Sequence, residues 1–157
     1  MESNNLSLAE NFQNYFTVEL ASTSKEKQSV YGIRYRVYCE EFEYEPAELF
    51  PDQVEHDEYD DISLHCLITH KSTNIPAACV RLVPAFVDGH DTQLPFEKYC
   101  AGSLDTDAIN QLGLERKTGC EISRLAVDSL FRKRTGETLT RFGDINLEFS
   151  KEEQRTF

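Results

Sequence analysis

The chain has 157 residues, a length that fits one domain with a single core. Its formal charge of −12 argues against general nucleic-acid binding, and the lack of any run of about 18 apolar residues predicts no membrane span. The N-terminus lacks the basic and apolar regions of a signal peptide, and the five cysteines form no Cys-x-x-Cys pair, so we expect a cytoplasmic protein with free thiols.

The first part of the chain predicts a helix, a strand and a longer helix. The amphipathic stretch Leu6–Phe16 favours a short helix, and Thr17–Ala21 favours a strand. Thr23 and Glu26 have the spacing of a capping box, which opens a helix. This second helix has a wide apolar face, as expected for a helix that lies on a sheet. The face consists of Val30, Tyr31, Ile33, Tyr35, Val37, Tyr38 and Phe42, and it is interrupted by Arg34 and Arg36.

The middle of the chain predicts a hairpin. Ile62–His70 and Ile75–Val83 have strand character, and Lys71–Asn74 is a plausible turn between them. The later predicted elements are short helices near Pro95–Tyr99 and Asp105–Leu112, a strand at Cys120–Val127 and a further strand at Asp144–Phe149. This order predicts a single α/β (α+β) domain of three layers. Because the tail after Asp128 is polar and short, the strand at Cys120–Val127 is expected to lack a neighbour on one side.

Cys120–Val127 has the composition of a buried strand, yet it carries the charged residues Glu121 and Arg124. Ionised groups inside a protein are costly unless they are paired or used in a site. Strict alternation puts the two side chains on opposite faces of a sheet, so only a β-bulge would bring both into one cleft. An active site and a structural ion-pair network with Arg81 explain this strand equally well.

The segment from Glu55 to Asp61 is strongly acidic. Asp57 and Asp60 would hold a cationic substrate or orient an arginine, and Arg81 stands in an otherwise apolar run. The segment lacks the central glycine of an EF-hand, and no second histidine stands at ligand spacing from His56, so no metal site is predicted. The competing explanation is a solvated loop, with an arginine that extends from a strand end to water.

Other catalytic patterns are not supported. Ser123 and Cys120 lie in a strand rather than at a strand-to-helix turn, and no Gly-x-Ser-x-Gly occurs. A Walker loop and a dinucleotide fingerprint are also absent from the sequence.

Taken in order, the motifs of this chain resemble those of the acyl-homoserine-lactone synthases and the related N-acyl amino acid synthases. The likeness is greater still to the acyltransferases associated with PEP-CTERM/exosortase systems, and it covers about residues 15–135. The motifs are Arg34-Tyr35-Arg36-Val37-Tyr38-Cys39-Glu40-Glu41, Glu55-x-Asp57-x-x-Asp60, Arg81-Leu82, Leu94-Pro95-Phe96, Glu121-x-Ser123-Arg124 and Phe131-Arg132-Lys133-Arg134.

The resemblance implies a GNAT fold, with a mixed, mostly antiparallel twisted sheet, helices on both faces and a splayed central strand. It implies transfer of an acyl group from acyl carrier protein, or from acyl-CoA, to the amine of an amino acid or a similar small molecule, with no tightly bound cofactor. Glu121, as the base, and Arg124 would be the catalytic residues. The substrate-binding positions would be Arg34, Asp57, Asp60, Arg81, Phe96 and Ser123.

The basic cluster Arg132-Lys133-Arg134 would suit an acidic carrier protein or a pantetheine phosphate. The sequence after Val127 lacks the glycine-rich loop with which CoA-dependent GNAT enzymes hold pyrophosphate, which favours a carrier-protein donor over acetyl-CoA with a polyamine acceptor. The resemblance also predicts that the C-terminal strands of the fold are missing or are completed in a homo-oligomer. The alternative function is therefore a truncated, catalytically silent domain that binds a carrier protein or a partner chain.

Overall fold

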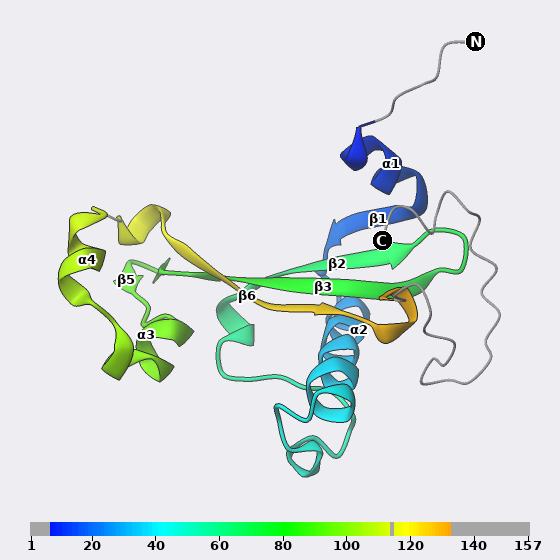
Figure 1. Cartoon of the computed structure of the whole chain (residues 1–157), viewed down its shortest axis with the longest axis horizontal. Coiled ribbons are helices and arrows are strands. Elements are labelled where there is room, and N and C mark those ends of the chain that lie inside the picture. The colour runs from blue at the N-terminus through cyan, green and yellow to red at the C-terminus, as the bar shows by residue number, and fades with distance from the viewer. Residues whose placement is uncertain (1–6, 114, 133–157) are drawn as a thin grey trace.

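The computed structural model of the chain describes residues 7–113 and 115–132 (Figure 1). Its centre is a four-stranded antiparallel sheet in the order β1-β2-β3-β6. The strands are β1 (Phe16–Leu20), β2 (Leu64–His70), β3 (Ile75–Pro84) and β6 (Cys120–Val127). The predicted mixture of helices with a mainly antiparallel sheet is confirmed. The tail strand predicted at Asp144–Phe149 lies outside the described residues.

Two helices flank the sheet near its N-terminal strand. Each of them, α1 (Leu8–Tyr15) and α2 (Ser24–Arg34), begins with a capping box. At α2, the Thr23 hydroxyl accepts a hydrogen bond from Glu26 N at 3.2 Å, and the Glu26 carboxylate accepts one from Thr23 N at 2.8 Å. These bonds satisfy N–H groups that lack a partner within the helix, so the predicted start of α2 is confirmed.

The helix after Arg34 changes type. Residues Tyr35–Glu41 form a π-helix, and Phe42 N donates to the Val37 carbonyl oxygen, five residues back, at 3.0 Å. The wider turn places Tyr38 against β6, where its hydroxyl donates to the Leu125 carbonyl oxygen at 2.8 Å. The single long helix predicted from the sequence is therefore an α-helix followed by a π-helix. Both segments contribute apolar side chains to the same core.

The main core lies between α2 and the sheet. Its buried members are Val30, Ile33 and Val37 from the helical segments, Leu67, Cys79 and Ala126 from the strands, and Ala21. Each large apolar side chain buried in this way contributes about 1.5–3 kcal/mol to folding. α2 packs on one face of the sheet through Val30 and Ile33, and Phe12 of α1 packs against a separate cluster on the other face.

The face of the sheet opposite α2 is only partly covered. Phe16, Ala77, Leu130 and Phe131 form a buried cluster there, against Phe12 of α1. Farther along the same strands, apolar side chains are 54–62% exposed; they are Val18, Leu20, Leu64 and Ile122. The strand register places Leu64, Leu82 and Ile122 in one row across three strands. The described residues thus leave a continuous apolar surface on this face.

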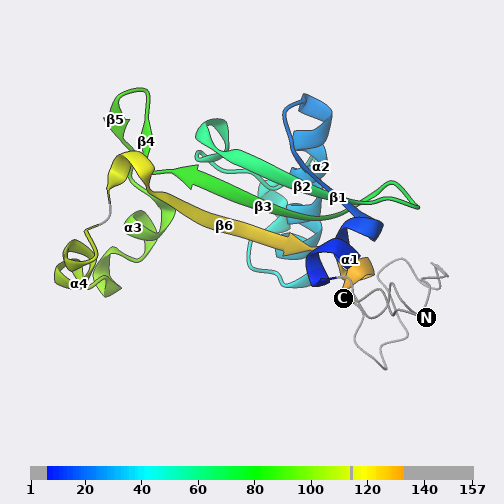
Figure 2. The same cartoon turned by 90° about the horizontal axis from the view of Figure 1, so that it is seen from above.

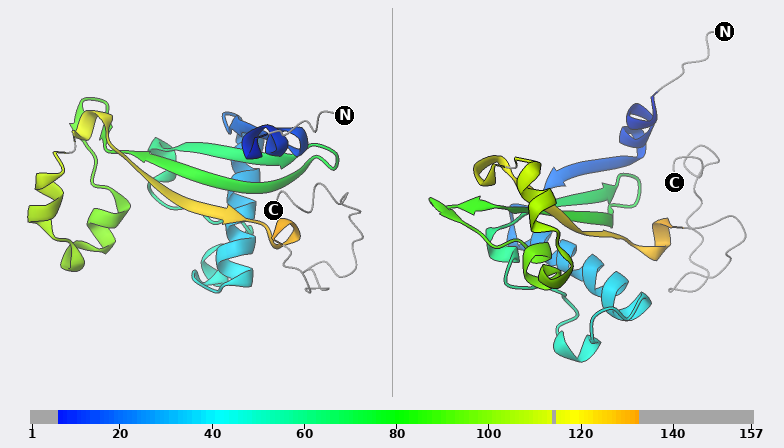
Figure 3. Two further views of the ribbon diagram at one scale, coloured as in Figure 1. Left: turned by 45° about the horizontal axis from the view of Figure 1, so that its top comes forward. Right: turned by 60° about the vertical axis from the view of Figure 1, so that its left-hand side comes forward.

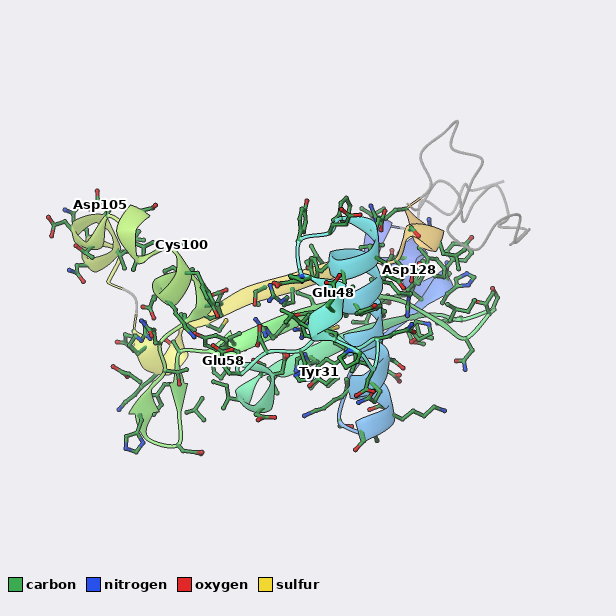
Figure 4. The ribbon with its side chains drawn as sticks, turned by 90° about the horizontal axis from the view of Figure 1, so that it is seen from below. Tyr31, Glu48, Glu58, Cys100, Asp105 and Asp128 are labelled. Atoms are coloured by element: carbon green, nitrogen blue, oxygen red, sulfur yellow. The ribbon has the colours of Figure 1, made fainter. Side chains whose placement is uncertain are left out.

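A small lobe extends beyond one end of the sheet (Figure 3, left). It contains β4 (Phe86–Val87), β5 (His90–Asp91), α3 (Pro95–Tyr99), α4 (Thr106–Gln111) and a 3₁₀ turn at Arg116–Thr118. Both short helices were predicted from the sequence. Figure 4 shows Cys100 and Asp105 at this end of the molecule and Asp128 at the other, beyond β6. Neither α2 nor any other helix of the two described ranges is long and apolar enough to cross a membrane.

β6 is the outermost strand of the described sheet on its side (Figure 2). It pairs with β3, and within residues 7–113 and 115–132 no strand pairs with its other edge. Cys120, Ile122 and Leu125 of this strand are exposed. The prediction of a buried strand was therefore wrong, because apolar composition alone does not show whether a strand is covered by other elements. The expectation that this strand lacks a neighbour on one side stays a prediction, because the residues after Arg132 lie outside the described ranges.

Candidate functional site

The site begins where α2 ends, at Arg34. This arginine is completely buried, and its Nη1 lies 2.7 Å from Asp60 Oδ1 while its Nε pairs with Glu55. Burial alone would lower the pKa of Arg34, but the hydrogen bonds and negative charges of Glu55 and Asp60 raise it above its usual value. Two carboxylates thus compensate for the desolvation of one guanidinium, as a buried charge requires.

Arg81 joins the acidic segment to the sheet. Its Nη1 lies 2.6 Å from Asp57 Oδ1 and 2.9 Å from Asp60 Oδ1, and its Nε donates to Ser123 Oγ at 3.2 Å. The side chain is only 2% exposed. The explanation of an arginine that reaches from a strand end to water is therefore wrong, and the explanation of the acidic segment as a solvated loop is wrong for Glu55 and Asp60, which are also buried.

The Asp60 carboxylate is ionised at the centre of these contacts. Burial, the largest single influence, would raise its pKa, but the hydrogen bond and charge of Arg34, a hydrogen bond from Asp57 N and the bond from Arg81 together lower it. Asp57 Oδ1 accepts hydrogen bonds from Arg81 Nη1 at 2.6 Å and from Tyr59 N at 2.9 Å. Both aspartates therefore orient arginines, which favours that option over direct binding of a substrate cation.

A β-bulge interrupts β6 in the middle of the site. Arg81 pairs with Ser123, whereas Cys79, two residues earlier on β3, pairs with Ala126. Between these pairs β3 has one residue, Val80, and β6 has two, Arg124 and Leu125. Arg124 has a φ of 52°, in the left-handed region that non-glycine residues adopt at a cost of about 1–3 kcal/mol. The bulge turns Arg124 away from the position that strict alternation would give it.

Arg124 therefore points toward the same acidic groups as Arg81. Its Nη2 lies 3.3 Å from Asp57 Oδ2 and 3.4 Å from carboxylate oxygens of Glu45 and Glu55. Its guanidinium carbon lies 5.6 Å from the centre of the Tyr38 ring. The side chain remains 28% exposed, so Arg124 is the arginine of this network that a ligand can reach.

Glu121 lies next to this network on the same face of the sheet. It pairs with Val83 and Ser123 pairs with Arg81, and residues two apart on a strand face the same side. Glu121 Oε2 accepts a hydrogen bond from Phe96 N, at the start of α3, at 2.9 Å. No lysine or arginine of the described ranges forms an ion pair with Glu121. Strict alternation would put Glu121 and Arg124 on opposite faces, and the β-bulge that would bring them to one face is present.

The arrangement includes most of the residues selected from the sequence. Those brought together in one network are Arg34, Asp57, Asp60, Arg81, Ser123 and Arg124, with Glu121 and Phe96 beside it. Arg132 lies elsewhere: its Nε donates to the Val127 carbonyl oxygen at 2.8 Å, and it pairs with Glu41. Lys133 and Arg134 lie outside the described residues.

Sequence reasoning gave no role to two buried residues of the network, Glu55 and His65. His65 Nε2 lies 3.3 Å from the Asp60 carbonyl oxygen, and its ring meets that of Tyr31 edge-on. Burial lowers the pKa of His65. The alternation of side chains along β2 could have indicated that His65 is buried, because it places His65 on the same face as the core residue Leu67. Among the residues that the structure describes, no three His, Cys, Asp or Glu side chains are arranged to hold a metal ion.

The family described as acetyltransferase (GNAT) domain matches the chain over residues 33–141. No curated protein and no solved structure matches it. The matched range contains the whole network of buried charges, the bulged strand and Glu121.

Proposed function

Because this chain belongs to the GNAT acetyltransferase family, we propose that it is an N-acyltransferase that acylates the amine of an amino acid or a similar small molecule. The observation that carries the proposal is the position of Glu121. It lies beside the network formed by Arg34, Arg81 and Arg124 and their carboxylate partners, yet its own carboxylate accepts a hydrogen bond from a backbone N–H, and no lysine or arginine of the described residues pairs with it. A carboxylate in this state is suited to accept a proton.

In the proposed reaction, the ammonium of the acceptor first loses one proton to solvent. The neutral amine nitrogen attacks the carbonyl carbon of an acyl thioester, and an N–C bond forms while Glu121 takes a second proton from the nitrogen. The C–S bond then breaks and the thiolate receives that proton from Glu121, so that the products are an amide and a thiol. A general base of this kind contributes about 10²–10⁴-fold to the rate.

The bulge in β6 has a second use in this mechanism. A bulge leaves one residue outside the hydrogen-bonding ladder, and a backbone N–H there can donate to a ligand. The oxyanion that develops on the thioester carbonyl is the natural acceptor for such a donor. The positions next to Arg124 and Leu125 therefore provide the proposed oxyanion contact.

Arg124 supports an amino acid as the acceptor. An amino acid presents an amine and a carboxylate a few ångströms apart, and Glu121 and the accessible Arg124 offer complementary groups on one face. Arginine binds carboxylates through two parallel hydrogen bonds. The resemblance of the motifs to those of N-acyl amino acid synthases points to the same acceptor class.

For the donor, we propose acyl carrier protein, with acyl-CoA as the alternative that is usual in GNAT acyltransferases. The cluster of Arg132, Lys133 and Arg134 follows directly after the site strand and is basic in an otherwise acidic chain. Such a patch favours encounter with an acidic partner. Of this cluster, only Arg132 belongs to the described residues.

The test is a reaction of the protein with an amino acid pool and either long-chain acyl carrier protein or the matching acyl-CoA, followed by mass spectrometry of N-acyl products. Product is expected, and Glu121→Gln should lower kcat/KM by about 100-fold or more. Glu19→Gln, an exposed strand carboxylate on β1, is the control and should have no effect. The absence of product with both donors, or full activity of Glu121→Gln, would overturn the proposal. Binding of carrier protein without product would support the silent-domain alternative.

A further inference from the structure

α3 is held against β6 by a closed ring of contacts. It has only five residues, Pro95–Tyr99, and a helix of that length is not stable without external contacts. Its second residue, Phe96, donates its backbone N–H to Glu121 Oε2 at 2.9 Å. N–H groups in the first turn of a helix have no partner within the helix, so this donor is available to the carboxylate.

Glu97 closes the start of the same helix. Its Oε2 accepts a hydrogen bond from Leu94 N at 2.8 Å, which fixes the orientation of the first turn. The hydrogen bond from Arg116 lowers the pKa of Glu97, so the cap stays ionised. The turn that presents Phe96 N to Glu121 therefore depends on Glu97.

Arg116 connects this cap to the strand that carries Glu121. Its Nη2 lies 3.0 Å from Glu97 Oε2, its Nη1 pairs with the other oxygen of Glu97, and it also donates to the Thr92 carbonyl oxygen. Arg116 opens the 3₁₀ turn that leads into β6. That turn is anchored in its place because Ala85 N donates to the Gly119 carbonyl oxygen at 3.0 Å. The ring thus runs from β6 through Glu121, α3 and Arg116 back to β6.

We infer that Glu97 and Arg116 are positioning residues, which hold the first turn of α3 so that its N–H occupies Oε2 of Glu121 and leaves Oε1 directed at the acceptor amine. The role of Oε1 rests on the proposed function. The role of Glu97 and Arg116 in holding Phe96 N against Glu121 Oε2 does not depend on it. A base held by one oxygen keeps the other in a defined direction, and misplacement of a reacting group by about 1 Å can cost 10²-fold in rate.

A second ion pair on α3 provides a matched control. Lys98 Nζ lies 2.5 Å from Glu58 Oε1 and ties α3 to the acidic segment, but these two side chains are 45% and 55% exposed. Figure 4 shows Glu58 on the part of the acidic segment nearest the lobe. This pair does not belong to the ring. If α3 needed only general attachment, Lys98→Met would act like Glu97→Ala.

The first measurement is amide hydrogen exchange of Phe96 by NMR in the full chain, which needs no substrate. Glu97→Ala should raise the exchange rate of this amide about tenfold, because that factor corresponds to the net free energy of one hydrogen bond. Arg116→Gln should have the same effect. Lys98→Met should leave it unchanged. Unchanged exchange in Glu97→Ala, or an equal increase in Lys98→Met, would overturn the inference whether or not the protein acylates amines.

The second measurement separates the positioning role from a loss of stability. Glu97→Ala should lower kcat about tenfold with little change in KM for either substrate, and Glu97→Gln, which keeps an acceptor for Leu94 N, should recover part of the loss. In a Glu121→Gln background, Glu97→Ala should have no further effect, since its action passes through Glu121. An equal loss in both backgrounds would contradict the inference. Full activity of Glu121→Gln alone would instead contradict the proposed function.

Discussion

Arg34 and Asp60 form an ion pair of 2.7 Å, between Nη1 and Oδ1, in which neither side chain exposes more than 4% of its surface. The pair joins the end of α2 to the acidic segment that follows it in the chain. Asp60 also contacts Arg81 of β3, so one carboxylate links a helix, a loop and a strand. If the acidic segment left the sheet, two buried guanidinium groups would lose their carboxylate partners.

Removal of the Asp60 charge is therefore expected to destabilise the whole domain. Asp60→Asn should lower the free energy of unfolding by about 3–5 kcal/mol, because it leaves Arg34 and Arg81 buried with incomplete compensation. The measurement is urea unfolding followed by circular dichroism. The neighbouring Asp61 is exposed, so Asp61→Asn should change stability by less than about 0.5 kcal/mol. Equal effects of the two substitutions would show that the pairing of Asp60 does not stabilise the domain.

The depressed pKa of Asp60 also predicts how stability depends on pH. The unfolded chain protonates this carboxyl near its ordinary pKa of 3.8, whereas the folded protein keeps it ionised to lower pH. The stabilisation is thus complete above that value and is lost as the pH falls through the lower pKa of the folded state. Unfolding midpoints between pH 6 and pH 2 should fall less steeply in Asp60→Asn than in the wild-type chain. An identical slope in both proteins would contradict this assignment.

The cysteines are expected to differ in their reactivity. Burial raises the pKa of Cys39 to about 11 and that of Cys79 to about 12, and the thiolate is the reactive form. Cys100 and Cys120 are exposed. At pH 8 a thiol reagent such as dithionitrobenzoate should therefore label Cys100 and Cys120 first, while Cys39 and Cys79 react only when the protein unfolds. Peptide mapping of the labelled protein would identify them, and early labelling of Cys79 would be inconsistent with the packing of α2.

The capping box of α2 should contribute measurably to stability. Thr23→Ala removes the hydroxyl that accepts from Glu26 N and should lower the free energy of unfolding by about 1 kcal/mol. Ser24→Ala, at the exposed next position, is the matched control and should be nearly neutral. Thermal unfolding of the three proteins is sufficient for the comparison, and a neutral Thr23→Ala would show that α2 is held by packing alone.

Arg124 is expected to affect acceptor binding. Arg124→Gln should raise KM for the amino acid by at least about tenfold, which is the value of a lost charged hydrogen bond, and should change KM much less for an amine without a carboxylate. Arg36→Gln is the control, because Arg36 is equally exposed but pairs with Asp128 at the far end of β6. Steady-state kinetics with both acceptors would decide this, and an equal change for the two acceptors would exclude a carboxylate contact.

The sequence was sufficient for most local structure, because caps, turns and alternation act over a few residues. The bounds of α3 and β6 and the start of α2 were all predicted. It was not sufficient for features that depend on distant neighbours. The exposure of Ile122 depends on which elements cover that face of the sheet, and the π-helix at Tyr35–Glu41 has no signal in the apolar spacing that predicted one long helix.

The same division holds for the site. The residue types of the network were recognised, because charged residues such as Arg81 in apolar runs need an explanation. The left-handed conformation of Arg124 has no local signal, since arginine does not favour it. The contact of Glu45 with Arg124 spans 79 positions and follows only from the fold. The proposed part of Glu97 could not be inferred without the position of β6.

The backbone conformation of Arg124 has a consequence for how such chains diverge. Glycine adopts a positive φ without steric strain, so an Arg124→Gly exchange would relieve backbone strain in β6 while it removes the guanidinium beside Asp57, Glu45 and Glu55. These two effects on stability oppose each other, so stability alone gives little reason to keep or to lose the arginine. Under the proposed function, selection for acyl transfer is what would retain it, and the identity of this residue would separate members of a family that keep the activity from those that keep only the fold.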